Sequence, residues 1–170
     1  KLILRYDGSA YCGWQRQQNG MSVQQRVEEA IEEVTGAYSF LEGCGRTDAG
    51  VHALCYTANF MSETSIPAEK LHLALNTKLP DDIRVLSAED MDESFHSRFS
   101  AIKKIYRYEI STNRIFDPFL INRVWNFFTE PANITDTDDG KLTKVYHQTV
   151  KKVTSDFEVL GFNTAIAQMM

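Results

Sequence analysis

Apolar and polar residues alternate along several short stretches of this 170-residue chain. Successive side chains of a strand point to opposite faces, so such alternation is typical of a strand with one buried face. The pattern predicts strands at residues 2–6, 38–42, 54–60, 82–86 and 105–110. Asp7-Gly8, a turn signal, ends the first of them.

A repeat of three to four residues predicts a helix after the first strand. It starts at Ser22, with Gln25 as the capping-box partner, and ends at Gly36. The apolar stripe that would face the core consists of Val23, Val27, Ala30, Ile31 and Val34. We therefore expect the glutamates of this helix to face water, namely Glu28, Glu29, Glu32 and Glu33.

A second helix is predicted between Pro67 and Pro80, because proline suits the start of a helix and cannot continue one. It would turn Leu71, Ala74 and Leu75 toward the core. The order of elements is then β-α-β-β-α-β. The predicted fold class is therefore α+β, with the split βαβ plan of a ferredoxin-like sheet.

Composition narrows the class of protein. Hydrophobic residues make up 43 % of the chain and charged residues 24 %, which is typical of a globular protein. The chain has no apolar run long enough to span a membrane, and Lys1–Leu4 lacks the layout of a signal peptide. The cysteines form no CxxC pair, and we interpret them as reduced thiols of a cytoplasmic protein.

The net charge of −5 disfavours an extended RNA-binding surface, because phosphates are contacted by Lys and Arg. The charge is segregated, however. Residues 98–114 hold five cations and a single anion: Arg98, Lys103, Lys104, Arg107, Arg114 and Glu109. A local basic patch therefore stays open as an RNA contact surface.

The most distinctive motif is a glycine-containing loop between two predicted strands, Gly45-Arg46-Thr47-Asp48-Ala49-Gly50-Val51-His52-Ala53. The Asp48 carboxylate would be accessible there, and Arg46 would favour its ionised form. An ionised carboxylate can act as a nucleophile or as a general base. From the residue types alone, an Asp and an Arg two positions apart are also a common turn-stabilising pair, so both interpretations stay open.

This motif resembles the signature of the tRNA pseudouridine synthase A (TruA) family, and further segments agree with that family in the same order. They are Tyr6–Gly8, Tyr11–Arg16, Ser22–Gln24, Ala74–Asn76, Leu79–Ile83, Phe95–Ala101 and Lys104–Tyr108. The resemblance covers residues 1–118 and implies a catalytic domain there. The implied reaction is the isomerisation of uridine to pseudouridine at positions 38 to 40 of the tRNA anticodon stem-loop.

The resemblance implies roles for three side chains. Asp48 matches the catalytic aspartate, which attacks the sugar or the base of the target uridine. Arg46 matches the arginine that pairs with this aspartate and helps to open the RNA. Tyr106 matches the tyrosine that packs against the target base, and its alternative is an ordinary core position in a strand. The reaction involves neither redox chemistry nor hydrolysis, so no cofactor and no metal are expected.

Substrate binding is expected from cations near the motifs, chiefly Arg16, Arg98 and Lys104, which could contact phosphates of the tRNA. For each of them a solvated surface charge is the alternative. Trp14 is expected to be a packed aromatic residue, with an RNA-facing role as the alternative. Full-length relatives work as homodimers, so the resemblance also implies a second copy of the chain as a partner.

A metal site is a further possibility to weigh, because histidines and cysteines lie near the motifs. They are His52, His96, Cys44 and Cys55. Their spacing fits no standard metal site, so we expect none.

The pattern changes after about residue 118, and residues 122–170 resemble the anticodon-binding helical region of leucyl-tRNA synthetase. Asn122–Phe128 fits this region, and periodicity predicts helices at 144–157 and from 162 onward. We therefore predict a helical segment at 119–170. A fusion of two partial genes and a chance resemblance are the two explanations. The alternative function is a non-catalytic tRNA-binding remnant that lacks the second half of the active-site cleft.

Overall fold

The computed structural model describes residues 1–121 and 123–126 of the chain. The chain divides into two units, Lys1–Tyr106 and Arg107–Met170, and each is described by itself. The helices predicted at 144–157 and from residue 162 lie outside the described residues.

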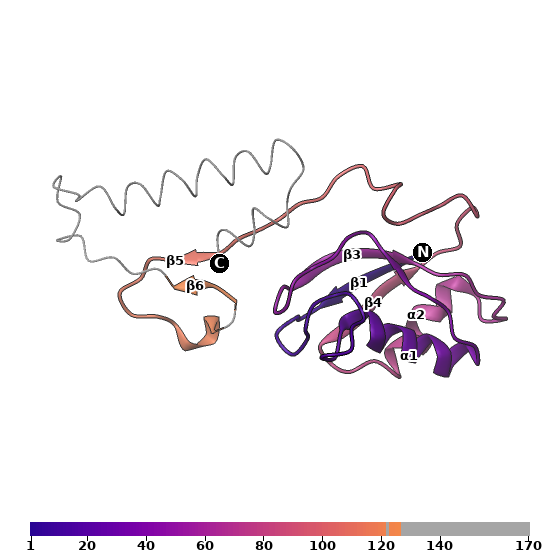
Figure 1. Ribbon diagram of the computed structural model, residues 1–170, viewed down its shortest axis with the longest axis horizontal. Helices are drawn as coiled ribbons and strands as arrows, with labels where there is room; N and C mark the ends of the chain where they lie inside the picture. The colour runs from indigo at the N-terminus through magenta and orange to yellow at the C-terminus, as the bar shows by residue number, and fades with distance from the viewer. Residues whose placement is uncertain (122, 127–170) are drawn as a thin grey trace. The chain divides into compact units, whose positions relative to one another are not determined.

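The first unit is an α+β domain with a four-stranded antiparallel sheet and two helices (Figure 1). Its elements follow in the order β1 (Leu2–Tyr6), α1 (Val23–Thr35), β2 (Glu42–Gly43), β3 (Ala53–Asn59), α2 (Ala68–Asn76) and β4 (Ile83–Ala88). The strands lie side by side in the order β2-β3-β1-β4. Both helices cover the same face of the sheet, as Figure 1 shows.

The hydrophobic core lies between the sheet and the helices. On β1, Leu2, Leu4 and Tyr6 are buried while Arg5 is exposed, as the alternation predicted. The other strands and the helices add Tyr56, Ala58, Ile83, Val85, Val23, Val27, Ala30, Ile31, Leu71 and Leu75. The core therefore joins every element of the sheet domain except the short β2.

Leu54 lies in the strand predicted at 54–60 and alternates in step with the buried Tyr56 and Ala58, yet it is 57 % exposed. Leu4 of β1 is paired with Tyr56, and Tyr6 is paired with Ala53, so β3 has one residue more than β1 between these pairs. Such a bulge breaks the alternation of side chains along a strand. Tyr56 therefore stays buried while Leu54 is turned out to solvent.

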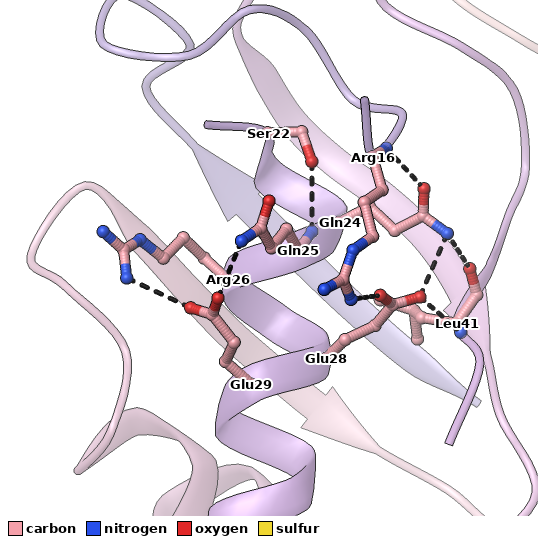
Figure 2. A network of polar contacts seen from close by, with 8 residues as sticks. All are labelled: Arg16, Ser22, Gln24, Gln25, Arg26, Glu28, Glu29 and Leu41. Carbon is pink, nitrogen blue, oxygen red and sulfur yellow. Dashed lines mark hydrogen bonds and ion pairs between the residues drawn. The ribbon is translucent and has the colours of Figure 1, made fainter. Parts of the chain in front are cut away.

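Helix α1 begins and ends where the sequence predicted. The Gln25 N–H donates to the Ser22 side chain at 3.2 Å, and Gly36 ends the helix with a φ of 79°. The expectation that the glutamates face water is wrong for Glu28, which is fully buried. The chain around Arg16 and Leu41 covers the flank of α1 that carries Glu28 (Figure 2).

Two predicted strands are much shorter than expected. Within 38–42 only Glu42 enters a strand, β2, and residues 101–109 have no regular secondary structure. The strand predicted at 105–110 shrinks to β5, Ile110–Ser111. Alternation indicates a face but does not supply the neighbouring backbone that a strand needs for pairing.

In the described part of the second unit, β5 pairs in parallel with β6 (Trp125–Asn126). A 3-10 helix, Pro118–Leu120, lies between them in the chain and is capped by the Asp117 side chain. A short strand thus occurs within Asn122–Phe128, where the helical interpretation expected a helix.

Candidate active site

The Asp48 motif forms the loop between β2 and β3. Asp48 and Arg46 are both exposed. Among the described residues, the Asp48 carboxylate takes part in no ion pair, and Arg46 is not within 4.0 Å of it. The turn is closed instead by the backbone, since the Val51 N–H donates to the Asp48 carbonyl at 3.2 Å. The carboxylate is therefore available for chemistry rather than engaged in holding the turn.

The backbone of this loop is held by buried aromatic residues. The Tyr6 hydroxyl shares a hydrogen bond of 2.9 Å with the Thr47 hydroxyl, and the Tyr56 hydroxyl donates to the Gly45 carbonyl. The Trp14 backbone N–H donates to the Thr47 carbonyl at 3.0 Å. Gly45 and Thr47, on either side of Arg46, are thus held in place, while the Arg46 and Asp48 side chains are exposed to solvent.

These three aromatic residues pack on one another as a cluster, with Trp14 and Tyr56 stacked at a centroid distance of 4.0 Å. Tyr6 lies 5.8 Å from Tyr56 and 6.1 Å from Trp14. Trp14 is only 3 % exposed, so its expected role as a packed aromatic is confirmed. Burial raises the pKa of the Tyr6 and Tyr56 hydroxyls well above 10, so both stay protonated.

At Gly13 the loop after β1 packs closely against the backbone of the Asp48 loop. Its φ is +111°, which side chains other than hydrogen rarely allow. A Cβ on Gly13 would stand 2.6 Å from the Thr47 carbonyl oxygen and 3.2 Å from the Asp48 carbonyl carbon. The sequence therefore needs glycine here both for backbone conformation and for space.

Lys104 and Tyr106 lie close in space to Cys44 and Gly45, at the start of the Asp48 loop. The Lys104 ammonium nitrogen lies 3.0 Å from the place that a Cβ on Gly45 would occupy. Tyr106 is 41 % exposed, and partial burial, followed by the proximity of Cys44, raises the pKa of its hydroxyl. Tyr106 is therefore not the strand core residue considered as its alternative, because residues 101–109 form no regular strand.

The backbone at Arg98 is held in place by hydrogen bonds of the preceding residue, Ser97. Ser97 is buried, its N–H donates to Asn59 Oδ1 at 2.8 Å, and its hydroxyl donates to the Glu42 carbonyl at 2.9 Å. Arg98 itself is exposed and its guanidinium carbon lies 5.7 Å from the centre of the Phe99 ring. The segment that carries Arg98 is thus anchored at β2, directly before the Asp48 loop.

Arg16 is held by a buried polar network that the sequence did not reveal (Figure 2). Its guanidinium donates to Glu28 Oε2 at 2.9 Å, and this hydrogen bond raises the pKa of Arg16 above its already high value. The Arg16 side chain is 49 % exposed, whereas that of Glu28 is inaccessible. Arg16 is therefore partly exposed to solvent and at the same time the ion-pair partner of a buried carboxylate.

Glu28 and Gln24 look like water-facing residues in the sequence, because their flank of α1 is polar on a helical wheel. The available signal was their spacing of four, which places both side chains beside the apolar stripe on the same flank. A polar pair beside the stripe is covered only when another segment packs over it, and the sequence did not indicate that segment.

Within residues 1–121 and 123–126, no group of three or more His, Cys, Asp or Glu side chains could hold a metal ion. His52 instead contacts the end of β1, since its Nδ1 accepts a hydrogen bond from the Gly8 N–H at 3.1 Å and lies 3.0 Å from Asp7 Oδ1. In the same part of the chain, no helix is both long and apolar enough to cross a membrane.

Known proteins match the part of the chain that contains the sheet domain and the Asp48 loop. The model of the tRNA pseudouridine synthase family matches residues 2–100, which include the Asp48 loop and Arg98, while Lys104 and Tyr106 lie beyond it. The chain is 47 % identical over 135 residues to the tRNA pseudouridine synthase A of Thermoanaerobacter sp. (strain X514), covering 79 % of this chain and 55 % of that protein.

Two clostridial proteins of the same name give similar values. Identity is 50 % over 112 residues for Clostridium kluyveri, covering 66 % of this chain and 46 % of that protein. Identity is 53 % over 110 residues for Clostridium acetobutylicum, covering 65 % and 45 %. None of these matches concerns leucyl-tRNA synthetase, so that resemblance stays a prediction.

This chain therefore spans about half the length of the curated relatives that it matches. The family match nevertheless takes in all of β1 to β4, together with the aromatic cluster and the loop that it holds. The chain belongs to the tRNA pseudouridine synthase family.

Proposed function

We propose that this chain provides the catalytic aspartate of a tRNA pseudouridine synthase, which isomerises uridine at positions 38 to 40 of the anticodon stem-loop. One observation carries the proposal: the exposed Asp48 carboxylate stands on a loop whose backbone is tied to buried aromatic residues. A group whose backbone is held in this way loses less freedom when it meets its substrate, which favours reaction. Membership of the family supports the chemistry.

In the proposed reaction the Asp48 carboxylate attacks the target uridine, either at C1′ of the sugar or at the base. The bond between C1′ and N1 breaks, the base turns, and a bond forms between C5 and C1′. The hydrogen at C5 leaves as a proton, N1 takes up a proton, and Asp48 is released as a carboxylate. Substrate and product are isomers, so the balance needs no oxidant and no cofactor.

Tyr106 and Arg46 have complementary roles in this proposal. A base that has left the helical stack needs an aromatic or apolar wall, and the partly exposed Tyr106 ring beside Cys44 offers one. Arg46, exposed two residues before Asp48, pairs with the aspartate in the loaded site and helps to open the RNA. Lys104, Arg98 and Arg16 contact phosphates of the tRNA partner.

Wider proposals follow from the family. The strand order β2-β3-β1-β4 with two helices on one face supports the ferredoxin-like plan. We also propose a catalytic domain over residues 1–118 with a separate segment from 119 to 170, a cytoplasmic location, and a homodimer as the active form. Sedimentation of the full chain with and without tRNA would test the dimer.

The decisive test measures tritium release from tRNA labelled at C5 of uridine. Wild-type protein is expected to release tritium in step with pseudouridine formation, and Asp48→Asn is expected to release none. Asp90→Asn, which changes another exposed acid, is the matched control and should behave as wild type. Binding of tRNA without any release would instead support the alternative, a tRNA-binding chain that does not turn over.

A further inference from the structure

Glu28 is an ionisable side chain without solvent access, yet three donors satisfy its carboxylate (Figure 2). Oε2 accepts from Arg16 Nη1 at 2.9 Å. Oε1 accepts from Gln24 Nε2 at 3.1 Å and from the Leu41 backbone N–H at 3.2 Å. Burial costs this carboxylate its hydration, so its three contacts call for an explanation.

Gln24, one helical turn earlier, also forms hydrogen bonds to the segments that contain Arg16 and Leu41. Its Oε1 accepts from the Arg16 backbone N–H at 2.9 Å, and its Nε2 donates to the Leu41 carbonyl at 3.1 Å. Arg16 is therefore held at its backbone by Gln24 and at its guanidinium by Glu28. Leu41 is held at both of its backbone polar groups.

Both held segments lead to the Asp48 loop. Two residues before Arg16, the Trp14 N–H donates to the Thr47 carbonyl. Strand β2 begins one residue after Leu41, and Cys44 and Gly45 follow it directly in the chain. The network on α1 thus holds both the segment that hydrogen-bonds to Thr47 and the segment that leads through β2 into the Asp48 loop.

The Arg16 guanidinium has donors to spare for a ligand. A guanidinium carries five N–H donors in a planar fork, and Glu28 takes one of the terminal nitrogens. Since half of the Arg16 side chain is exposed, the rest of the fork can meet a phosphate while Glu28 holds its inner edge. A long cation held in one conformation loses less entropy when it binds.

We propose that Glu28 is a positioning residue for RNA binding, acting through Arg16. Glu28 holds the guanidinium in the conformation that contacts a phosphate of the tRNA, and this inference rests on the proposed function. The network fits this role, because the buried Glu28 carboxylate of α1 holds a guanidinium whose side chain is half exposed to solvent.

Whether Glu28→Gln weakens or strengthens RNA binding distinguishes a positioning role of Glu28 from a general effect of its charge. In Glu28→Gln, the amide oxygen can keep the contacts to Gln24 and to Leu41, while the NH2 group faces Arg16 and cannot accept its hydrogen bond. Loss of a negative charge from a protein of net charge −5 favours RNA binding at long range. Loss of a positioned Arg16 opposes it.

We expect Glu28→Gln to bind an anticodon stem-loop RNA about tenfold more weakly than wild type, the effect of one charge-assisted hydrogen bond. The slope of log affinity against log salt should fall in magnitude by about one, because one phosphate contact is lost. Glu29→Gln is the matched control: it removes the same charge one residue along, where Glu29 pairs with Arg26 at 3.1 Å. It should bind no more weakly than wild type.

Arg16→Lys is the second variant, and it decides the matter if Glu28→Gln does not fold, which circular dichroism would reveal. It keeps the charge but replaces the fork by a single ammonium, so it should lose the same affinity and the same salt slope. The double variant should bind no more weakly than the weaker single one, because both changes remove one contact.

Three outcomes overturn the inference. Affinity and salt slope could be unchanged in both single variants, Glu28→Gln could bind more tightly than wild type, or the two losses could add in the double variant. Wild-type protein that binds no stem-loop RNA would overturn the proposed function as well. Binding without tritium release would defeat only the proposed catalysis, since affinity still tests the role of Glu28.

Discussion

Gly13→Ala is the substitution for which the structure makes the sharpest prediction. Gly13, in the loop after β1, packs against the Asp48 loop, and a methyl group there would meet the Thr47 carbonyl oxygen at 2.6 Å. That oxygen accepts the Trp14 N–H and belongs to the residue directly before Asp48. Backbone on both sides has to move before the methyl group can be accommodated.

The expected cost has two parts. An alanine at a φ of +111° is strained by about 1–3 kcal/mol. Overpacking against backbone rather than against a flexible side-chain end adds about 1–3 kcal/mol. The combined loss of about 2–6 kcal/mol is a large part of the roughly 5–15 kcal/mol by which a domain is stable. A shift of the loop by about 1 Å would also lower turnover by about a hundredfold.

Urea unfolding followed by circular dichroism measures the first effect, and tritium release under conditions where the variant is folded measures the second. Gly36→Ala is the control, because Gly36 also has a positive φ, of 79°, but no atom lies within 4 Å of its added Cβ. It should lose about 1 kcal/mol of stability and no turnover. If Gly13→Ala is as stable as Gly36→Ala and as active as wild type, the close contact does not position Asp48.

Four further predictions concern the Asp48 loop and the residues around it. Asp48→Asn should abolish tritium release and leave the urea midpoint almost unchanged, because the carboxylate is exposed; residual release would refute its role as nucleophile. Tyr106→Leu should lower turnover more than tRNA affinity, and equal losses in both would indicate a structural role. Tyr56→Phe should cost about 1 kcal/mol of stability and slow turnover, since the bond to the Gly45 carbonyl is lost. Burial raises the pKa of the Tyr6 and Tyr56 hydroxyls in the folded state. Their contribution to stability is therefore complete below about pH 10, the pKa of tyrosine in the unfolded chain, and is lost as pH rises through the pKa of the folded state. Urea midpoints should therefore fall above pH 10, less steeply in Tyr56→Phe, and identical slopes would contradict the burial of that hydroxyl.

Local chemistry in the sequence was enough for the elements that depend on near neighbours. The alternation of Leu2, Leu4 and Tyr6 and the caps at Ser22 and Gly36 placed β1 and α1 correctly, because these signals act within a few residues. The strand predicted at 105–110 is reduced to Ile110–Ser111 for the opposite reason: a strand depends on a pairing segment that can come from anywhere in the chain, and residues 101–109 form no regular secondary structure.

The sequence by itself determined the acid, the arginine and the glycine-containing loop that carries them, since these residues stand together as one contiguous motif. Only the tertiary structure decided that Tyr6, Trp14 and Tyr56 hold this loop from three different segments, and that Glu28 lies in the interior against Arg16. Whether a carboxylate on a helix flank meets water or a guanidinium depends on which distant segment packs over it, and no short-range pattern records that choice.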